Sequence, residues 1–150
     1  MKTLLLDTNL LLVWTVGQYG KEVIETHRRT NGYSVEDFEM LLLYIGQYQR
    51  MVSTPGILTE TSNLIAQTAE PLDRKLKGFM AELISSFIEV HQPSINYNLT
   101  PEFSELGMTD AGIVYLSEPA DMVLTVDLKL YLSCLSKDLN VENFNHYRFA

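Results

Sequence analysis

Short apolar runs alternate along the chain with longer segments in which apolar residues recur every three or four positions. Five of these runs predict β-strands, at residues 2–6, 51–53, 88–91, 121–126 and 141–147. The first and fourth runs are almost entirely apolar, which is typical of central parallel strands that are covered on both faces. The chain is therefore expected to build its core around these two runs.

The segments between the strands predict helices, at residues 10–16, 21–29, 35–48, 55–65, 71–87, 101–106, 111–116 and 127–137. Gly17 is expected to close the first helix, and a capping box at residues 34–37 opens the third. Thr54 followed by Pro55 is typical of an N-cap with proline at the first helical position. Thr109 or Asp110 is expected to cap the seventh helix.

Strands and helices alternate from one end of the chain to the other. This order predicts an α/β fold, with a mostly parallel sheet, helices on both faces and right-handed crossovers. No internal repeat and no linker rich in Pro, Gly or Ser interrupts it. A length of 150 residues with 46% hydrophobic residues suits a single domain, here residues 1–150.

Charge and cysteine content narrow the classes of protein. Eleven Lys and Arg against 19 Asp and Glu give a net charge of −8, which argues against a surface that is basic throughout. One cysteine, Cys134, cannot form an internal disulfide, and no paired Cys/His spacing suggests zinc. These features favour a reducing, cytoplasmic setting. No segment reaches the roughly 18 apolar residues of a membrane span, so no membrane association is expected.

Four acids stand where predicted strands end or helices lie just beyond them: Asp7, Glu60, Asp110 and Asp127. The carboxyl ends of parallel strands share one edge of a sheet, where ligands of open α/β folds bind. These acids are therefore expected to converge although they are far apart in sequence. Carboxylates that share a crevice repel one another, and a hard divalent cation such as Mg²⁺ or Mn²⁺ relieves that repulsion. This arrangement favours metal-assisted hydrolysis of a phosphodiester.

Each acid also has a structural explanation. Capping of a helix accounts for Asp110 or Asp127 taken alone, and Glu60 alone reads as a solvated helix residue. Asp7 is harder to explain in this way, because a carboxylate at the end of an apolar strand is costly unless it is paired or binds a cation.

Four segments of the chain resemble motifs of the PIN-domain nucleases and occur in the order of that family. They are residues 4–12, which contain Asp7, residues 53–64 with Glu60, residues 106–113 with Asp110, and residues 123–127 with Asp127. The resemblance spans most of the chain. It does not cover residues 18–50, which form a helical insertion by comparison with a minimal member of the family.

The resemblance implies a three-layer α/β/α sandwich and an endoribonuclease that depends on Mg²⁺ or Mn²⁺ and leaves 5′-phosphate and 3′-hydroxyl ends. By this resemblance, the catalytic and metal-binding acids are Asp7, Glu60, Asp110 and Asp127. Asn9 and Thr125 are expected to orient ligands or water, although hydrogen bonds within turns or caps explain them equally well. Small members of the family are often toxins that form dimers and are silenced by an antitoxin, so an antitoxin partner and a homodimer are further expectations.

RNA is the expected substrate, and Arg28, Arg29 and Lys129 are candidates to contact its phosphates. A second basic cluster lies at residues 74–77. The competing interpretation is that these side chains are solvated surface charges. At the level of function, the alternative is a catalytically inactive PIN-like module that binds nucleic acid or regulates a partner. A receiver-like domain fits less well, because Thr8, and not a second acid, follows Asp7.

Overall fold

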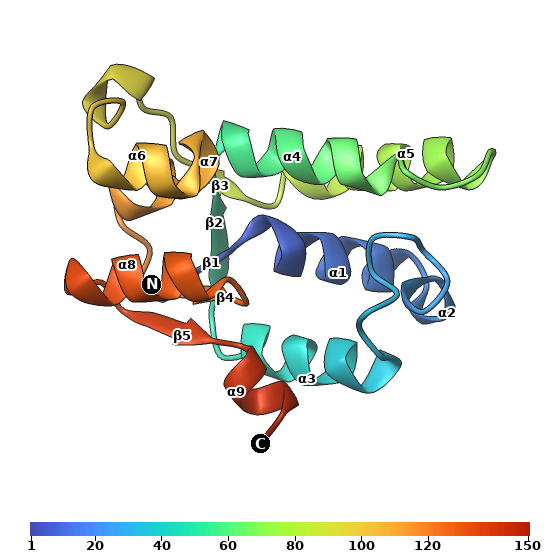
Figure 1. Ribbon diagram of the computed structural model, residues 1–150. Helices are drawn as coiled ribbons and strands as arrows, with labels where there is room; N and C mark the ends of the chain where they lie inside the picture. The colour runs from blue at the N-terminus through green and yellow to red at the C-terminus, as the bar shows by residue number, and fades with distance from the viewer.

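A five-stranded sheet forms the centre of the protein in the computed structural model, which describes residues 1–150. All neighbouring strands pair in parallel, in the order β3-β2-β1-β4-β5. The strands are β1 (Thr3–Leu6), β2 (Arg50–Ser53), β3 (Ile88–Glu89), β4 (Met122–Thr125) and β5 (Val141–Asn143). Helices lie on both sides of this sheet, so the predicted α/β/α sandwich is confirmed, with a sheet that is parallel throughout (Figure 1).

The helices follow the strands in chain order. They are α1 (Thr8–Tyr19), α2 (Lys21–Ile24), α3 (Val35–Ile45), α4 (Pro55–Ile65), α5 (Leu72–Ile84), α6 (Pro101–Leu106), α7 (Met108–Val114), α8 (Leu128–Ser136) and α9 (Asn145–Arg148), with the short 3₁₀ helix η1 (Ser94–Asn96) before α6. In Figure 1, α1 and α3 lie on one side of the sheet, and α6 and α8 lie on the other.

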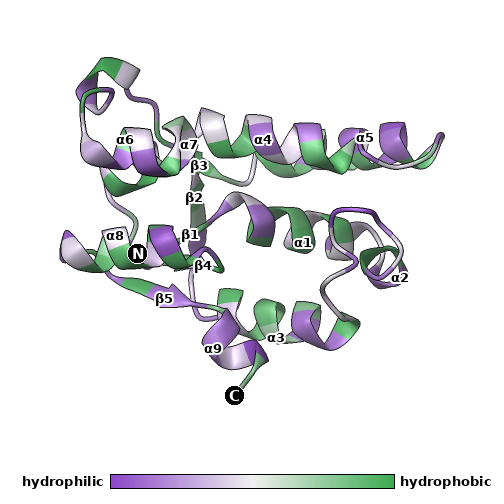
Figure 2. Ribbon diagram, viewed as in Figure 1, coloured by the Kyte–Doolittle hydropathy of each residue, from purple (hydrophilic) through white to green (hydrophobic).

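The core centres on β1 and on the helix that follows it. Leu4, Leu5 and Leu6 are buried, as is nearly all of α1 from Leu10 to Val16. Figure 2 shows this hydrophobic stretch along α1 in the middle of the molecule, whereas α3 and α5 mix hydrophobic and hydrophilic positions. Because both sides of β1 and one whole helix are covered, the centre of the sheet is fixed, and so are the residues at its carboxyl edge.

The chain changes direction across the sheet at β1. The β-α-β connections run from β1 to β2 and β3 on one side, and β4 and β5 lie on the other side. Leu6 pairs with Leu124, so Asp7 and the end of β4 reach the carboxyl edge together. Such a switch point is where open α/β sheets leave a crevice for ligands.

Local signals placed several helices as predicted. Ser34 and Asp37 form the expected capping box of α3, and Thr54 caps α4 with Pro55 at its first position. The expectation that Gly17 ends the first helix is wrong, because α1 continues to Tyr19. Gly17 instead lies against Phe38 of α3 so closely that a methyl group there would collide with the ring. Glycine at this position therefore allows α3 to approach α1.

Two further predictions need correction. The helix expected at residues 21–29 ends at Ile24, and the hydroxyls of Thr26 and Thr30 bond to the last carbonyls of that helix. The strand expected at residues 141–147 ends at Asn143. Its side-chain oxygen accepts a hydrogen bond from the Asn145 N–H, which turns the chain into α9.

Candidate active site

Asp7 follows β1 directly and is the N-cap of α1. Its Oδ1 accepts a hydrogen bond from the Leu10 N–H at 2.9 Å, and its Oδ2 accepts from the Val126 N–H at 3.0 Å and from the Thr125 hydroxyl at 2.5 Å. The side chain is buried, and this burial raises the pKa of Asp7 above its usual value, with a smaller contribution from the charge of Asp127. Its hydrogen bonds act in the opposite direction.

Thr125, at the end of β4, links Asp7 to Asp127. It is fully buried, donates to Asp7, and accepts a hydrogen bond from the Asp127 N–H at 2.9 Å. Asp127 is exposed and caps α8, with its Oδ1 bound to the Leu130 N–H at 3.0 Å. The contact between β1 and β4 therefore brings these two acids to the same point of the carboxyl edge.

Glu60 reaches this edge from α4. The Thr8 hydroxyl donates to its Oε1 at 3.2 Å, and the Thr109 hydroxyl donates to its Oε2 at 2.5 Å. Each carboxylate oxygen is therefore held by a helix that lies far from Glu60 in sequence, α1 on one side and α7 on the other. These two contacts fix the position of an otherwise exposed side chain.

Asp110 lies in the first turn of α7 and differs from the other three acids. Its carboxylate takes part in no hydrogen bond or ion pair within the protein. Burial, and then the negative charges of Asp7, Asp127 and Glu60, together raise the pKa of Asp110 to about 7. Asp110 is therefore the acid whose charge the protein leaves uncompensated.

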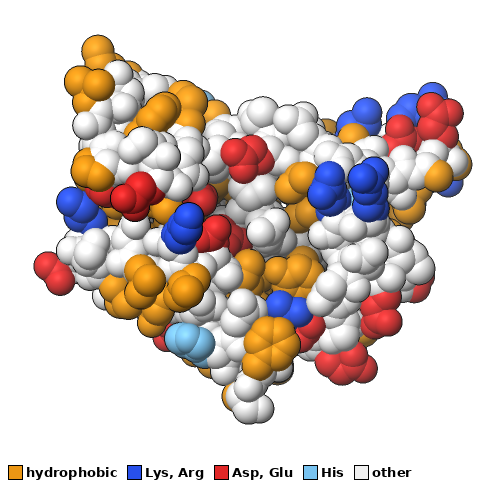
Figure 3. All heavy atoms as spheres, viewed as in Figure 1, with side chains coloured by type: hydrophobic (Ala, Val, Ile, Leu, Met, Phe, Trp, Pro, Cys, Tyr) orange, Lys and Arg blue, Asp and Glu red, His pale blue; other side chains and the backbone are white.

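The four acids thus interact electrostatically at one edge, where Figure 3 shows acidic side chains in the hollow at the centre of this face. None of them forms an ion pair with Lys, Arg or His. No group of three or more His, Cys, Asp or Glu side chains, however, is arranged to hold a metal ion. Asp7 and Asp127 are instead hydrogen-bonded at the starts of helices, and Glu60 to two threonine hydroxyls.

The residues present fit a hydrated hard cation better than a fully protein-enclosed one. All four side chains offer oxygen atoms, which Mg²⁺ and Mn²⁺ prefer. Mg²⁺ is usually held by one or two carboxylates and keeps several waters. Asp110, which has no partner in the protein, would be the first ligand, with the neighbouring acids bound directly or through water.

The structure confirms one expectation for capping and corrects another. Asp127 caps α8 as predicted and Asp7 caps α1, whereas Gly107 occupies the N-cap position of α7, so neither Thr109 nor Asp110 is the cap. Gly107 has a φ of 87°, a value that residues other than glycine rarely adopt. This backbone conformation lets α7 begin directly after α6. As a result, Asp110 is left free of the cap hydrogen bond.

Of the two polar neighbours singled out in the sequence, Thr125 contacts two of the acids, whereas Asn9 is exposed and its side chain makes no hydrogen bond. Sequence reasoning missed Thr8 and Thr109, which hold Glu60. In two of the motifs a threonine stands next to an acid, since Thr8 follows Asp7 and Thr109 precedes Asp110, and this pattern could have indicated them. Tyr33 of the 18–50 segment also interacts with this edge, because burial and then the charge of Asp7 raise its pKa to about 12.

The three predicted phosphate contacts lie at two places. Lys129 is exposed in the first turn of α8, two residues after Asp127, and forms no ion pair. Arg28 and Arg29 are exposed on the segment after α2. That segment is fastened to the end of α4, because the Arg29 Nε donates to Gln67 and the His27 ring bonds to the Ile65 carbonyl.

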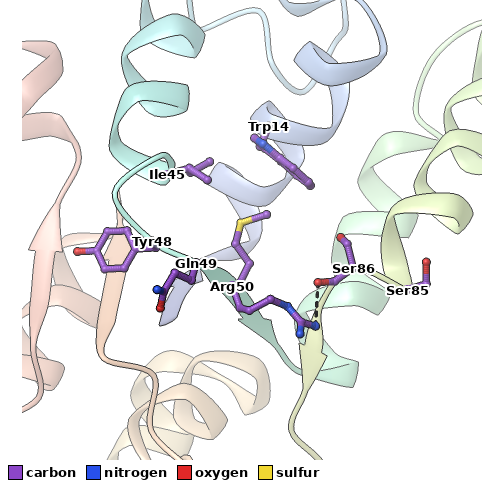
Figure 4. Close-up of a pocket in the computed structure, with 8 residues that line it drawn as sticks. Trp14, Ile45, Tyr48, Gln49, Arg50, Ser85 and Ser86 are labelled. Atoms are coloured by element: carbon purple, nitrogen blue, oxygen red, sulfur yellow. Dashed lines mark hydrogen bonds between the residues drawn. The ribbon is translucent and has the colours of Figure 1, made fainter. Parts of the chain in front are cut away.

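A further hollow lies at the other edge of the sheet. It measures about 560 Å³ and is lined by residues that include Trp14, Ile45 and Tyr48. Figure 4 shows Trp14 and Ile45 beside this hollow, with the Arg50 guanidinium bonded to the Ser86 carbonyl. No acidic side chain lines it.

None of the helices has both the length and the apolar character that crossing a membrane requires. In comparisons with known proteins, no protein-family model and no curated protein matches this chain.

Proposed function

We propose that this chain is an endoribonuclease of the PIN type that requires Mg²⁺ or Mn²⁺ and acts at the edge formed by Asp7, Glu60, Asp110 and Asp127. The observation that carries this proposal is the state of Asp110. Its carboxylate is half-buried, has no partner within the protein, and is repelled by the negative charges of three further acids. A protein keeps such a group at a stability cost, and perturbed acids of this kind cluster at functional sites.

Each acid has a separate task in this proposal. Asp110 and Asp7 provide oxygen atoms for the cation, and Asp127 adds negative charge beside them. Glu60, which is fixed by two threonine hydroxyls, orients the attacking water and accepts its proton. When bound, Mg²⁺ or Mn²⁺ would acidify that water and neutralise charge on the phosphate.

The basic residues favour RNA as the substrate. Arg28 and Arg29 lie beside the turn between α4 and α5, and the basic cluster at residues 74–77 occupies the first turns of α5. None of the cations in these two clusters forms an ion pair, although the chain carries a net charge of −8. Figure 3 shows Lys and Arg side chains gathered at this end of the molecule. We infer that they contact phosphates of a strand whose cleaved bond lies at the acids.

The biological role follows from the resemblance to PIN-domain nucleases alone. In this role the chain is a toxin that acts on cytoplasmic RNA, forms a homodimer and is silenced by an antitoxin. The single cysteine, Cys134, is buried and unpaired, which fits a reducing compartment.

A cleavage assay tests the proposal. Purified protein is incubated with structured and unstructured RNA in Mn²⁺, in Mg²⁺ or in EDTA. We expect cleavage that requires the metal and falls at least about 100-fold in Asp7→Asn and Asp110→Asn. Asp138→Asn is the matched control, because Asp138 is exposed at the far end of α8 and has a positive φ that suits Asn. Cleavage that persists in EDTA would contradict the proposal.

A second candidate function is a catalytically inactive PIN-like module. The observation that favours it is the lack of three acids already arranged around one ion. Under this alternative, Mn²⁺ raises the melting temperature of the wild type, and not that of Asp110→Asn, while no RNA is cut.

A further inference from the structure

A cavity of about 170 Å³ lies beside the acidic edge and is separate from the larger hollow at the opposite edge. Three parts of the chain enclose it: the start of α4, the segment that leads from β3 into η1, and α7. Figure 1 shows these parts next to one another, where α4 meets α7. The residues that matter below are Gly56, Gln92, Ser94, Tyr97, Met108 and Gly112.

The cavity shares a wall with the proposed active site. Thr109 lines it and also donates a hydrogen bond to Glu60. Gly56 lies on the same wall, where an added methyl group would stand 3.2 Å from the Thr109 hydroxyl oxygen. Only the Thr109 side chain would therefore separate a molecule held in the cavity from Glu60.

Tyr97 gives the cavity an unused polar group. This residue is only 7% exposed, yet its hydroxyl makes no hydrogen bond within the protein. A methyl group on Gly112 would lie 3.3 Å from that hydroxyl oxygen, and Gly112 itself lines the cavity. The hydroxyl thus faces space that a glycine keeps open. Its oxygen is not among the fully buried side-chain atoms without a partner, so it is accessible from the cavity and can bond to a molecule that enters it.

The chemistry of the walls indicates what kind of group fits. None of the residues that line the cavity is charged. The Gln92 amide is already occupied, since it donates to the Gly112 carbonyl and accepts from the Ser117 N–H. The hydroxyls of Tyr97 and Ser94 remain available, and Met108 offers an apolar surface that is 51% exposed. These features suit a neutral group with polar edges and an apolar face, and they do not suit a phosphate.

We propose that this cavity receives one base of the RNA strand, next to the bond that is cut. The proposal rests on the proposed nuclease function, and it makes Tyr97 and Gly112 determinants of which nucleotide precedes or follows the cleaved bond. The Tyr97 hydroxyl bonds to the edge of the base, and Met108 covers its face.

Binding of free ribonucleosides in EDTA tests this site without metal, phosphate or catalysis. The methyl group of Met108 is the reporter in ¹³C-methyl NMR of the full chain, and the remaining methionines among the six are internal controls. We expect at least one of the four nucleosides to shift the Met108 signal. Tyr97→Phe should weaken that binding about 3- to 10-fold, and Gly112→Ala about tenfold or more.

Gly78→Ala is the matched control, because nothing lies within 4 Å of the methyl group it adds to a helix. RNA cleavage is measured on the same samples in Mn²⁺. If wild-type protein cuts RNA but no nucleoside shifts Met108, or if Gly112→Ala and Tyr97→Phe bind nucleosides as the wild type does, the base site is wrong and the nuclease stands. If nucleosides bind as expected but RNA is never cut, the base site is supported and the nuclease is wrong.

Discussion

At the amino edge of the sheet a hollow of about 560 Å³ is lined by uncharged residues and one arginine. At the carboxyl edge a cavity of about 170 Å³ is lined in part by Thr109, which holds Glu60, one of the four acids at that edge. The polar groups of the amino edge satisfy one another. Arg50 donates to the Ser86 carbonyl, the Gln49 side chain accepts from the Lys2 N–H, and the Lys2 ammonium lies 5.0 Å from the centre of the Tyr48 ring.

The carboxyl edge is organised differently. Asp110 has no hydrogen bond, and the Tyr97 hydroxyl has none either, although both side chains are at least half buried. An uncompensated carboxylate such as that of Asp110 lowers stability, so a fold tolerates it where it has another use. The size of a hollow therefore says less about function than the state of the polar groups around it. The amino edge is expected to contribute to stability, and the carboxyl edge to activity.

The largest effect on stability is expected from the amino edge. Trp14→Ala removes a nearly buried ring that packs edge-on against Phe87, with 5.9 Å between ring centres. We expect a loss of about 3 kcal/mol in the free energy of unfolding, because the cavity left behind adds to the lost burial. Unfolding in urea should be followed by circular dichroism, since Trp14 is the only tryptophan. Metal-dependent cleavage well below the melting temperature should stay within about twofold of the wild type.

The next effect is a gain in stability at the carboxyl edge. The pKa of Asp110 is raised from 3.8 to about 7 in the folded protein. Between these two values the folded state holds a proton that the unfolded state has lost, so stability falls as pH rises through this window. At pH 8, Asp110→Asn should therefore unfold with a free energy about 1–3 kcal/mol higher than that of the metal-free wild type, after allowing for solvent screening of a half-buried group.

At pH 5 the difference should shrink to about a third of its value at pH 8, because the folded carboxyl is then mostly neutral while the unfolded one is already ionised; it should vanish only below about pH 4. Denaturant melts at both pH values, with EDTA present, give the comparison. An equal difference at pH 5 and pH 8 would mean that the carboxylate is compensated in a way that the structure does not show. Mg²⁺ should reduce the difference at pH 8, since it binds the folded wild type through this carboxylate.

Much of the fold could be predicted from the sequence because its signals are local. The capping box at residues 34–37 and the Thr54-Pro55 pair fix helix starts through contacts within one turn. The apolar runs that became β1 and β4 are buried on both faces, so their composition alone identifies them. The carboxyl ends of these strands then place Asp7 and Asp127 together.

The remaining features depend on contacts between distant parts of the chain. Gly17 is an interior helix residue and not a helix end, and the contact that requires glycine there is with the Phe38 ring of another helix. The contact between Glu60 and Thr109 joins residues 49 positions apart, and no spacing rule indicates it. The sequence predicts Thr109 or Asp110 as the cap of α7, whereas Gly107 holds that position, because its positive φ is a property of the folded backbone.

A smaller effect should separate positioning from binding at the carboxyl edge. Thr109→Val removes the hydroxyl that holds one oxygen of Glu60 and keeps the shape of the side chain. We expect cleavage to fall about tenfold at saturating RNA, with the stability changed by about 1 kcal/mol at most. Thr59→Val is the matched control, because Thr59 is exposed next to Glu60 in sequence and makes no side-chain hydrogen bond. An equal loss in both variants would show that Thr109 does not position Glu60.

The smallest effect is expected from the single cation of the amino hollow. Arg50 is exposed, and its guanidinium makes one hydrogen bond, to the Ser86 carbonyl at 3.3 Å. Arg50→Met keeps the length of the side chain and removes the charge. Because exposed polar contacts of this kind contribute little, the free energy of unfolding should change by less than about 0.5 kcal/mol, and RNA cleavage should not change. A clear loss of RNA binding in this variant would place part of the substrate at the amino edge, and the division of the sheet into a structural edge and an active edge would then be wrong.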